Sequence, residues 1–372
     1  MMNILHVSGS SSWGGNEQQL LYLIEGLGKY NVTQSLFCFQ TSHLMEKVKD
    51  LEIEILSITK SSPFSKKYRK CLSEFVAAKH IDIIHLHTSD SLTGYVITDM
   101  FYDLPVKTIF SKKAVSSKTS FLSKFKYNYH HIDSIVCVSG YVKKHFKKVL
   151  NTKNHHKLSV IHDGVDEYDK ENPIKLNLKE KLRLKNSDCI IGNIANHTKA
   201  KDLPVMVETL NYLVNTLKLS DVHLVQIGNF SKRTHVLKNK IKEYGLESHI
   251  TFIGFVENAF MLFPQFDIFL MTSEREGGPT VVLESFKNRI PVVTTKVGII
   301  EECVKNGEQA FVAEVGDFKS LGESIFTLKG DSRIREQFAE RAYKLFVENF
   351  TVNHLIEATY THYNEILKPQ KT

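Results

Sequence analysis

Short apolar runs alternate with amphipathic stretches along most of the chain. The run at residues 4–7 is typical of a buried strand, and the leucines and isoleucine of the next segment, 17–29, recur at helical spacing. Further strand-like runs and one helical segment follow at 81–86, 91–100, 106–110 and 134–138. Strands that alternate with helices predict a parallel sheet covered on both faces.

The rhythm breaks near residues 163–166, and the polar, lysine-rich segment 167–187 predicts a linker and a surface helix. Strand-like runs then restart at 189–194, 222–227, 249–253, 268–271 and 291–294. Because 372 residues are too many for one ordinary core, we predict an α/β protein of two doubly wound, Rossmann-like domains that face each other across a cleft. We place the first domain at 1–165 and the second at 166–350, with a C-terminal helix at about 351–372 that packs back on the first.

Composition adds limits on class and location. With 42% hydrophobic and 24% charged residues, the chain has the composition of a globular protein. The N-terminus has no basic start and only a short apolar run, so we expect no signal peptide, and no apolar run suits a membrane span. The five cysteines are scattered without a CxxC pair, which predicts reduced thiols in the cytoplasm rather than disulfides or zinc.

The stretch SEREGGPTVVLESF, residues 273–286, places a glycine-rich turn between a strand-like run and a helical segment. Pro279 suits the first helical position, where its missing N–H costs nothing, and Gly278 would then be the N-cap. The backbone N–H groups of Gly277, Gly278, Thr280 and Val281 would point out of the helix start. Such a start binds anions, so the turn is a candidate phosphate site; an ordinary strand-to-helix turn is the alternative.

Two carboxylates, Glu276 and Glu284, flank this turn. A carboxylate beside a phosphate would repel it unless it serves a neutral part of the ligand, and sugar hydroxyls are such a part. Glu276 could therefore hold sugar hydroxyls and Glu284 a ribose diol. The alternative for Glu284 is a solvated helix position, which its apolar neighbours, such as Val282 and Leu283, make less attractive.

Glu276 and Glu284, with seven residues between them, resemble the E-x7-E motif of the retaining glycosyltransferases of the GT-B fold, the group-4 family. The flanking segments 249–274 and 290–312 are similar to the same family. The resemblance implies a hexosyltransferase-type enzyme that moves a sugar from a nucleotide diphosphate sugar to a hydroxyl with retained configuration. It also implies metal-independent chemistry, and no Asp-x-Asp pair for a metal occurs in the chain.

Weaker matches assign residues of the first domain. Gly14 and Gly15 resemble the glycine turn that faces the donor phosphates and sugar. Segment 82–91 resembles the family's D-h-h-H-x-H segment, so His87 is the candidate active-site histidine and His85 more plausibly a core or supporting one. Segment 160–166 resembles a hinge motif in which Asp163 replaces the usual asparagine.

Further matches assign residues of the second domain. In segment 194–202, Lys201 falls at the family's diphosphate-binding lysine, whereas Asn196 stands at the arginine position, a departure that removes one cation. Lys199 could compensate. The turn at Gly254 is expected to contribute to base recognition, largely through backbone. His87, Glu276 and Lys201 are thus the predicted catalytic residues, with Lys201, the helix start and its dipole stabilising the leaving diphosphate.

Segment 111–150 contains nine lysines and one acidic residue, interleaved with apolar and aromatic side chains. We predict peripheral association with the inner face of the cytoplasmic membrane, serving a lipid-linked or envelope glycan acceptor. A solvated basic face is the alternative, and no motif supports nucleic-acid binding. The lysines assigned to this face are Lys112, Lys113, Lys124, Lys126, Lys143, Lys144, Lys147 and Lys148.

The predicted role is therefore a transferase in bacterial cell-envelope polysaccharide synthesis, with a UDP-sugar favoured as donor although the sequence fixes neither base nor sugar. Two alternatives remain. A nucleotide-sugar 2-epimerase shares the architecture, but its acid/base motifs are not found here. A non-catalytic nucleotide-sugar-binding subunit is left open by Asn196.

Overall fold

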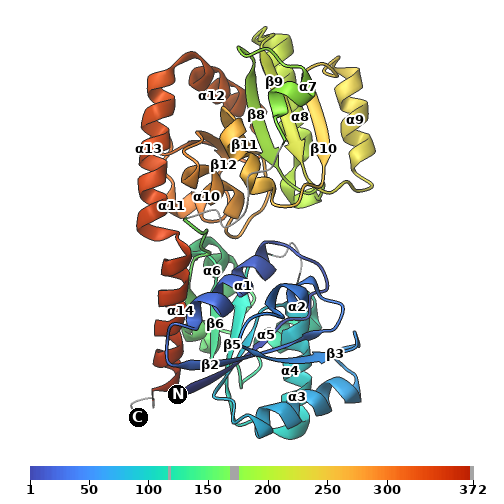
Figure 1. Ribbon diagram of the computed structural model, residues 1–372, viewed down its shortest axis with the longest axis vertical. Helices are drawn as coiled ribbons and strands as arrows, with labels where there is room; N and C mark the ends of the chain where they lie inside the picture. Colours follow the sequence, from blue (N-terminus) through green and yellow to red (C-terminus); the bar gives the residue numbers. More distant parts are fainter. Residues whose placement is uncertain (116–118, 168–175, 369–372) are drawn as a thin grey trace. The chain divides into compact units, whose positions relative to one another are not determined.

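The computed structural model describes residues 1–115, 119–167 and 176–368. The chain divides into two compact units, described separately: unit 1 comprises Met1–Gly164 and Val352–Thr372, and unit 2 comprises Val165–Thr351 (Figure 1). Each unit is an α/β layer structure with one parallel sheet, as the alternating pattern predicts. Part of the expected linker, 168–175, lies outside the described residues, as do the last residues of the tail.

Unit 1 has a seven-stranded sheet in its described part, ordered β3-β2-β1-β4-β5-β6-β7 and parallel throughout. Its strands are β1 (Met2–Val7), β2 (Val32–Phe39), β3 (Glu54–Ile58), β4 (Ile83–Leu86), β5 (Lys107–Lys112), β6 (Ser134–Cys137) and β7 (Leu158–Val160). The chain order reverses between β1 and β4, which are neighbours. The loops after these two strands therefore meet at the point where doubly wound sheets bind ligands.

The helices of unit 1 cover both faces of this sheet (Figure 1). They are α1 (Gly15–Leu27), α2 (His43–Val48), α3 (Lys66–Ala78), α4 (Ser89–Tyr102), α5 (Phe121–Tyr127), α6 (Gly140–Lys147) and α14 (Val352–Leu367). Although α14 is last in the chain, its Leu355, Ile356 and Tyr363 are buried with residues of β1 and α1. The C-terminal helix is therefore part of the core of unit 1.

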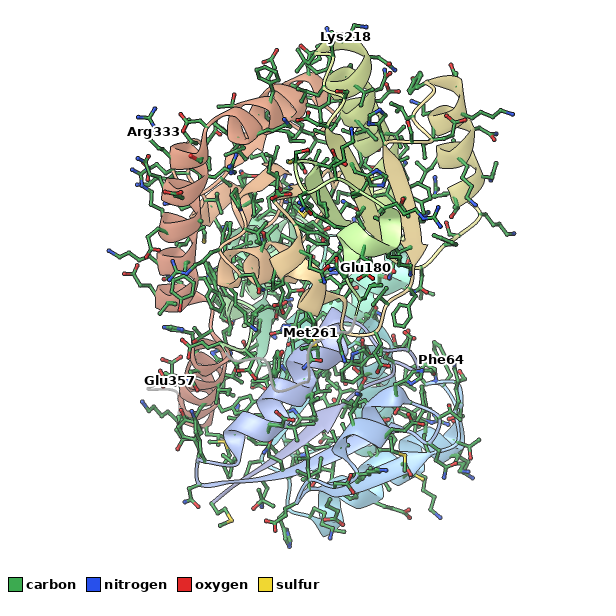
Figure 2. The ribbon with its side chains drawn as sticks, turned by 45° about the horizontal axis from the view of Figure 1, so that its top comes forward. Phe64, Glu180, Lys218, Met261, Arg333 and Glu357 are labelled. Carbon is green, nitrogen blue, oxygen red and sulfur yellow. The ribbon has the colours of Figure 1, made fainter. Side chains whose placement is uncertain are left out.

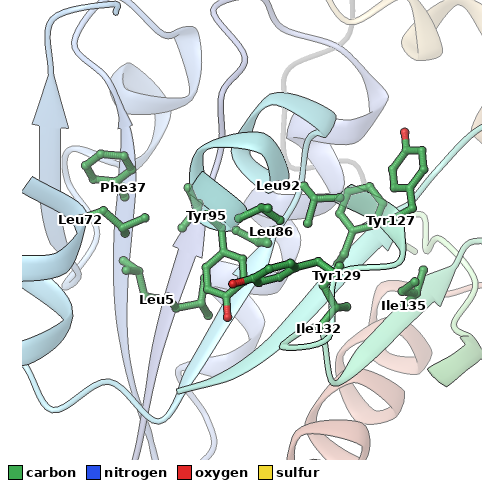
Figure 3. Packing of buried hydrophobic residues seen from close by; sticks show 14 of the residues in the cluster. Leu5, Phe37, Leu72, Leu86, Leu92, Tyr95, Tyr127, Tyr129, Ile132 and Ile135 are labelled. Atoms are coloured by element: carbon green, nitrogen blue, oxygen red, sulfur yellow. The ribbon is translucent and has the colours of Figure 1, made fainter. Parts of the chain in front are cut away.

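The larger core of unit 1 lies on the other face, under α3 and α4. Figure 3 shows Leu5, Phe37 and Leu86 from the sheet beside Leu72 and Tyr95 from these helices. All five side chains are buried, Tyr95 completely. Aliphatic and aromatic side chains pack against one another here, so the sheet and its helix layer are held by close packing of apolar surface.

Unit 2 has a six-stranded parallel sheet in its described part, ordered β10-β9-β8-β11-β12-β13. Its strands are β8 (Cys189–Ile194), β9 (Val222–Ile227), β10 (Ile250–Gly254), β11 (Ile268–Met271), β12 (Val292–Thr295) and β13 (Phe311–Ala313). The order reverses between β8 and β11, so the loops after these strands, which carry Lys201 and Glu276, lie next to each other.

The helices of unit 2 are α7 (Leu178–Leu182), α8 (Leu203–Asn211), α9 (Thr234–Glu243), α10 (Thr280–Lys287), α11 (Ile300–Cys303), α12 (Phe318–Gly330) and α13 (Ser332–Asn349). They bury one apolar cluster on each face of the sheet. Polar side chains project outward; Arg333 on α13, labelled in Figure 2, is 86% exposed.

Candidate active site

The predicted donor residues of unit 2 converge around one carboxylate. Lys201, which ends a 3-10 turn after β8, places its Nζ 2.6 Å from Oε1 of Glu276 in the loop after β11. The Ser273 hydroxyl donates to the same oxygen at 2.7 Å. The two loops are also joined through their backbones, because the N–H of Glu274 donates to the carbonyl of Ala200 at 2.8 Å. Both charged side chains are largely buried, 25% and 14% exposed, so the pair is held in a fixed geometry.

The glycine-rich turn leads into α10, but its cap differs from the sequence prediction. Helix α10 begins at Thr280, and Pro279 is the N-cap, with φ −71° and ψ 92°. The prediction of Gly278 as N-cap and Pro279 as first helical residue was wrong by one position. The reason is the extended ψ of Pro279, which starts the helix one residue later. The N–H groups at this helix start still belong to Thr280 and its neighbours.

A residue that the sequence analysis did not single out supports this turn. Gly298, after β12, has φ +59°, and a Cβ there would lie 2.6 Å from the carbonyl oxygen of Gly277. The next residue, Ile299, donates its N–H to that same carbonyl at 3.1 Å. The glycine is needed because the 276–277 backbone packs directly on it. In the sequence, Gly298 is visible only as one glycine in an apolar segment, which does not reveal this contact.

Three further predicted donor residues, Glu284, Asn196 and Gly254, also belong to unit 2. Glu284 is half-buried in the second turn of α10, next to the buried Leu283. Asn196 carries no charge to replace the family's arginine; its Oδ1 accepts the N–H of Asn229 at 2.8 Å and so joins the loops after β8 and β9. Gly254 ends β10 with φ +87° and accepts the N–H of Gly228.

In unit 1, His87 follows β4 directly and is buried. Its Nε2 lies 3.0 Å from Nδ1 of His6 on β1, and Nε2 of His6 lies 3.2 Å from Oε1 of Gln34 on β2. Burial lowers the pKa of His87 well below its ordinary value, and interactions with His85, His6 and Lys113 act in the same direction. Burial also lowers the pKa of His6 from 6.5 to about 4. Both rings are therefore neutral at physiological pH.

The glycine turn after β1 is fixed to the same histidine. Gly14 is the N-cap of α1, in extended conformation, and Asn16 donates from Nδ2 to the carbonyl of His87 at 3.2 Å. A Cβ at Gly14 would contact the carboxylate of Glu17 at 3.4 Å. Gly14, Gly15 and His87 therefore lie together where β1 and β4 end, as the sequence analysis expects.

The ring of the third histidine, His85, makes a hydrogen bond through each of its two nitrogens. Its Nδ1 lies 2.6 Å from Oη of Tyr363 and its Nε2 2.8 Å from Oγ of Ser111. One nitrogen of each of His6, His85 and His87 lies within 4.8 Å of the others, a spacing that could suit a metal ion. Because His6 and His85 already use both nitrogens in hydrogen bonds, the geometry favours a hydrogen-bonded cluster over a metal centre.

Two family models match the chain over adjacent segments. Residues 13–168 match "Glycosyltransferase Family 4", and residues 174–345 match "Glycosyl transferases group 1". Together these segments take in all of the loops described above. The chain belongs to this glycosyltransferase family.

Relatives of the glycosyltransferase agree with this assignment. N-acetyl-alpha-D-glucosaminyl L-malate synthase of Bacillus anthracis is 21% identical over 330 residues, 87% of this chain and 84% of the relative. O-antigen biosynthesis glycosyltransferase WclY of Escherichia coli is 26% identical over 212 residues, 57% of each chain. The solved structure of Anabaena HepE in complex with UDP and glucose has a TM-score of 0.83 at 18% identity, covering 98% of this chain and 100% of the other. The fold is that of the GT-B glycosyltransferases.

The lysine-rich segment of the glycosyltransferase is less exposed than the sequence suggests. Lys112 is buried at the end of β5, 5.3 Å from the ring centre of Phe146, and burial lowers its pKa. Lys113 is largely buried in an ion pair with Asp163, at 2.5 Å. Assigning these two lysines to an exposed face was wrong, because Lys112 ends the inner strand β5 under its helix cover and Lys113, the next residue, is held against Asp163.

Other lysines of the segment differ in exposure. Lys126 is half-buried and donates to the Ser89 hydroxyl at 2.7 Å, and Lys143 is half-buried. The exposed ones are Lys124, Lys144, Lys147 and Lys148. In the described ranges, no helix is both long and apolar enough to cross a bilayer.

Proposed function

We propose that this glycosyltransferase moves a sugar from a nucleotide diphosphate sugar to an acceptor hydroxyl with retention of anomeric configuration and without a metal ion. The observation that carries the proposal is the fixed Lys201–Glu276 pair beside the start of α10. It puts a cation and backbone N–H groups next to a carboxylate. That combination suits a diphosphate linked to a sugar, because the phosphate takes the donors and the sugar hydroxyls bond the carboxylate.

In the proposed reaction, the bond between the anomeric carbon and the diphosphate oxygen breaks as the acceptor oxygen attacks the same face. The acceptor's proton passes to the leaving diphosphate. Lys201 and the N–H groups of Gly277, Gly278, Thr280 and Val281 stabilise the charge that develops on this leaving group. Glu276 holds the sugar hydroxyls, Glu284 holds the ribose, and His87 orients the donor sugar.

A UDP-sugar is the favoured donor. The neighbouring structure of HepE holds UDP and glucose, and two exposed aromatic side chains, Phe230 and Phe255, flank the Gly254 turn where we expect the base. Aromatic faces stack on nucleobases of any sequence, so they support a base site without selecting uracil. A thermal-shift panel of nucleoside diphosphates tests this donor: UDP should raise the melting temperature most, and a larger shift with GDP or ADP would overturn the choice.

The proposed site is tested by transfer rates. Removing a preorganised donor at a developing charge costs about 10²–10³ in rate, so Lys201→Ala should lose at least that much. Glu276→Gln replaces the charged acceptor of the sugar hydroxyls by a neutral, weaker one and should also slow transfer. Lys329→Ala is the matched control, because it removes an ion pair with Asp221 of similar length, 2.7 Å, also in unit 2. Transfer within a few fold of wild type in the Lys201 variant would refute the assignment.

The same assay separates the alternatives. A nucleotide-sugar 2-epimerase would release an altered nucleotide sugar without an acceptor, and a non-catalytic subunit would bind donor without turning it over. Acceptor-dependent release of nucleoside diphosphate supports transfer. For the acceptor we propose a glycan or lipid-linked saccharide of the bacterial envelope, supported by the O-antigen role printed for WclY.

Peripheral membrane association remains part of the proposal in a narrower form. Helix α5 exposes Phe121, Leu122 and Phe125 at 84%, 76% and 53%, with the exposed Lys124 between them. An apolar face beside cations suits an anionic membrane surface. Flotation with anionic vesicles tests it: Phe121→Ser/Leu122→Ser should reduce salt-sensitive binding, whereas Phe64→Ser, which removes an exposed aromatic elsewhere in unit 1, should not. Equal loss in both variants would contradict this surface.

A further inference from the structure

A chain of hydrogen bonds runs through the core of unit 1 to His87. The Gln34 amide donates from Nε2 to the carbonyl of Ile24 on α1 at 2.9 Å. Oε1 of Gln34 lies 3.2 Å from Nε2 of His6, and Nδ1 of His6 lies 3.0 Å from Nε2 of His87. All three side chains are buried, 7%, 0% and 4% exposed.

The protons of this chain can be placed in only one way. A backbone carbonyl can only accept, so Gln34 must turn its NH₂ toward Ile24 and its oxygen toward His6. That oxygen can only accept, so His6 carries its proton on Nε2 and accepts on Nδ1. His87 must then carry its proton on Nε2 to donate to His6, which leaves Nδ1 of His87 as a bare acceptor.

The neutral state that this placement needs is secured by burial. A protonated imidazole carries N–H on both nitrogens, so a charged His6 would direct an N–H at the N–H of His87. Burial lowers the pKa of both rings, so this conflict does not arise near neutral pH. His85, whose ring centre lies 4.0 Å from that of His87, belongs to a separate pair of hydrogen bonds.

We propose that Gln34 and His6 are positioning residues that hold His87 in its Nε2–H tautomer, so that its Nδ1 accepts a hydrogen bond from a hydroxyl of the donor sugar. This inference rests on the proposed function, in which His87 orients that sugar. It gives His6 on β1 and Gln34 on β2 a part in catalysis that acts only through His87. In the opposite tautomer His87 would present an N–H there and would no longer orient a hydroxyl as donor.

A tautomer can be measured without an activity assay. In protein with ¹⁵N-labelled histidine, the two ring nitrogens of His87 give distinct chemical shifts in long-range ¹H–¹⁵N spectra, assigned by their loss in His87→Gln. We expect the Nε2–H tautomer in wild type. Gln34→Met keeps the length of the side chain but removes the acceptor for His6. Both rings should then populate the other tautomer, and kcat should fall by about tenfold or more with a smaller change in KM.

Two variants control for structural damage. His6→Asn retains an acceptor, Oδ1, near the place of Nδ1, so it should keep the His87 tautomer and restore most of the rate lost in His6→Leu. Tyr363→Phe removes a buried hydroxyl from the neighbouring His85 and should change stability but neither the His87 tautomer nor kcat.

The outcomes distinguish this inference from the proposed function. An Nδ1–H tautomer of His87 in wild type, or an unchanged tautomer and rate in Gln34→Met, would overturn the positioning role. If instead the tautomers behave as expected but His87→Ala transfers sugar at the wild-type rate, the role of His87 in the proposed function fails, and the catalytic part of this inference fails with it.

Discussion

Replacing Gly298 by alanine should damage the proposed donor site, although Gly298 is not itself one of the residues proposed to bind the donor. Two effects add. Alanine at φ +59° incurs the left-handed penalty of about 1–2 kcal/mol. Its Cβ would also lie 2.6 Å from the carbonyl oxygen of Gly277, so in a close-packed interior the 276–277 backbone must move by about half an ångström or more. Overpacking of this kind costs about 1–3 kcal/mol, giving about 2–5 kcal/mol in all.

Gly307→Ala is the matched control for this variant. Gly307 also has a positive φ, +79°, but an added Cβ would meet nothing within 4 Å. It should therefore cost only the conformational penalty, about 1–2 kcal/mol, and leave transfer unchanged. Urea unfolding and kcat/KM for the donor measure the two effects separately.

The decisive result is the rate. Because Glu276 precedes the displaced carbonyl directly, a shift of this size should lower kcat/KM by about 10²-fold in Gly298→Ala. If the two glycine variants lose the same stability and both transfer sugar at the wild-type rate, the contact between Gly298 and the donor loop does not matter and the reasoning is refuted.

Three further outcomes are expected. Lys201→Ala should weaken UDP binding in calorimetry as well as slow transfer, since it removes a cation facing the diphosphate; unchanged affinity would contradict that placement. The folded pKa of His6 is about 4 and the ordinary value 6.5, so the unfolded chain binds a proton in this window that the folded chain does not. Stability should therefore fall as pH drops from 6.5 to 4, by about 3 kcal/mol from this residue, and urea unfolding of His6→Asn should show a weaker pH dependence. Gly26→Ala should destabilise unit 1 by about 1–3 kcal/mol, since an added Cβ would lie 1.9 Å from the Ile356 side chain of α14. Gly28→Ala is the control: its Cβ would lie 3.6 Å from the Glu25 carbonyl oxygen, so thermal unfolding should barely change.

Much of the fold follows from the periodicity of the sequence. The predicted ends of β8, β9 and β11 coincide with those in the structure, because each of these inner strands is mostly apolar, with only Asn193, His223 and Gln226 as polar positions. The same pattern does not reveal β2, where Gln34 and Ser35 interrupt the apolar residues although both are buried. A buried polar side chain looks like an exposed one in sequence, because its partner lies elsewhere in the chain.

The residues of the candidate site could be predicted where their spacing along the sequence places them directly after particular strands. Glu276 and Lys201 come together because they follow neighbouring strands, which the sheet order requires. Their direct ion pair, the support of Gly298 and the burial of Lys112 depend on three-dimensional packing and have no short-range signal. His6 did have one: it is a histidine inside a four-residue apolar run, and this departure from the pattern marks a side chain with a buried partner.

Unit 2 also contains a buried glutamine that hydrogen-bonds to a histidine. Comparing the two networks shows what is different about the chain of hydrogen bonds that ends at His87. Gln226 on β9 donates to the carbonyl of Ala195 at 2.6 Å, and its oxygen lies 2.8 Å from Nε2 of His197. The same reasoning leaves Nδ1 of His197 as acceptor, and the Thr234 hydroxyl donates to it at 2.8 Å. That network closes on the protein itself, so satisfying buried groups accounts for it.

The chain of hydrogen bonds in the described part of unit 1, by contrast, does not end on a protein group. In the described residues no protein group hydrogen-bonds to Nδ1 of His87, although by the same reasoning a glutamine places the proton of that ring on Nε2. Apolar side chains would fill the positions of Gln34 and His6 without the cost of desolvating two polar side chains. A network that fixes an acceptor and then leaves it for a ligand is therefore better explained by orientation of a substrate hydroxyl than by stability, and that is why the tautomer of His87, rather than its presence, is the quantity to measure.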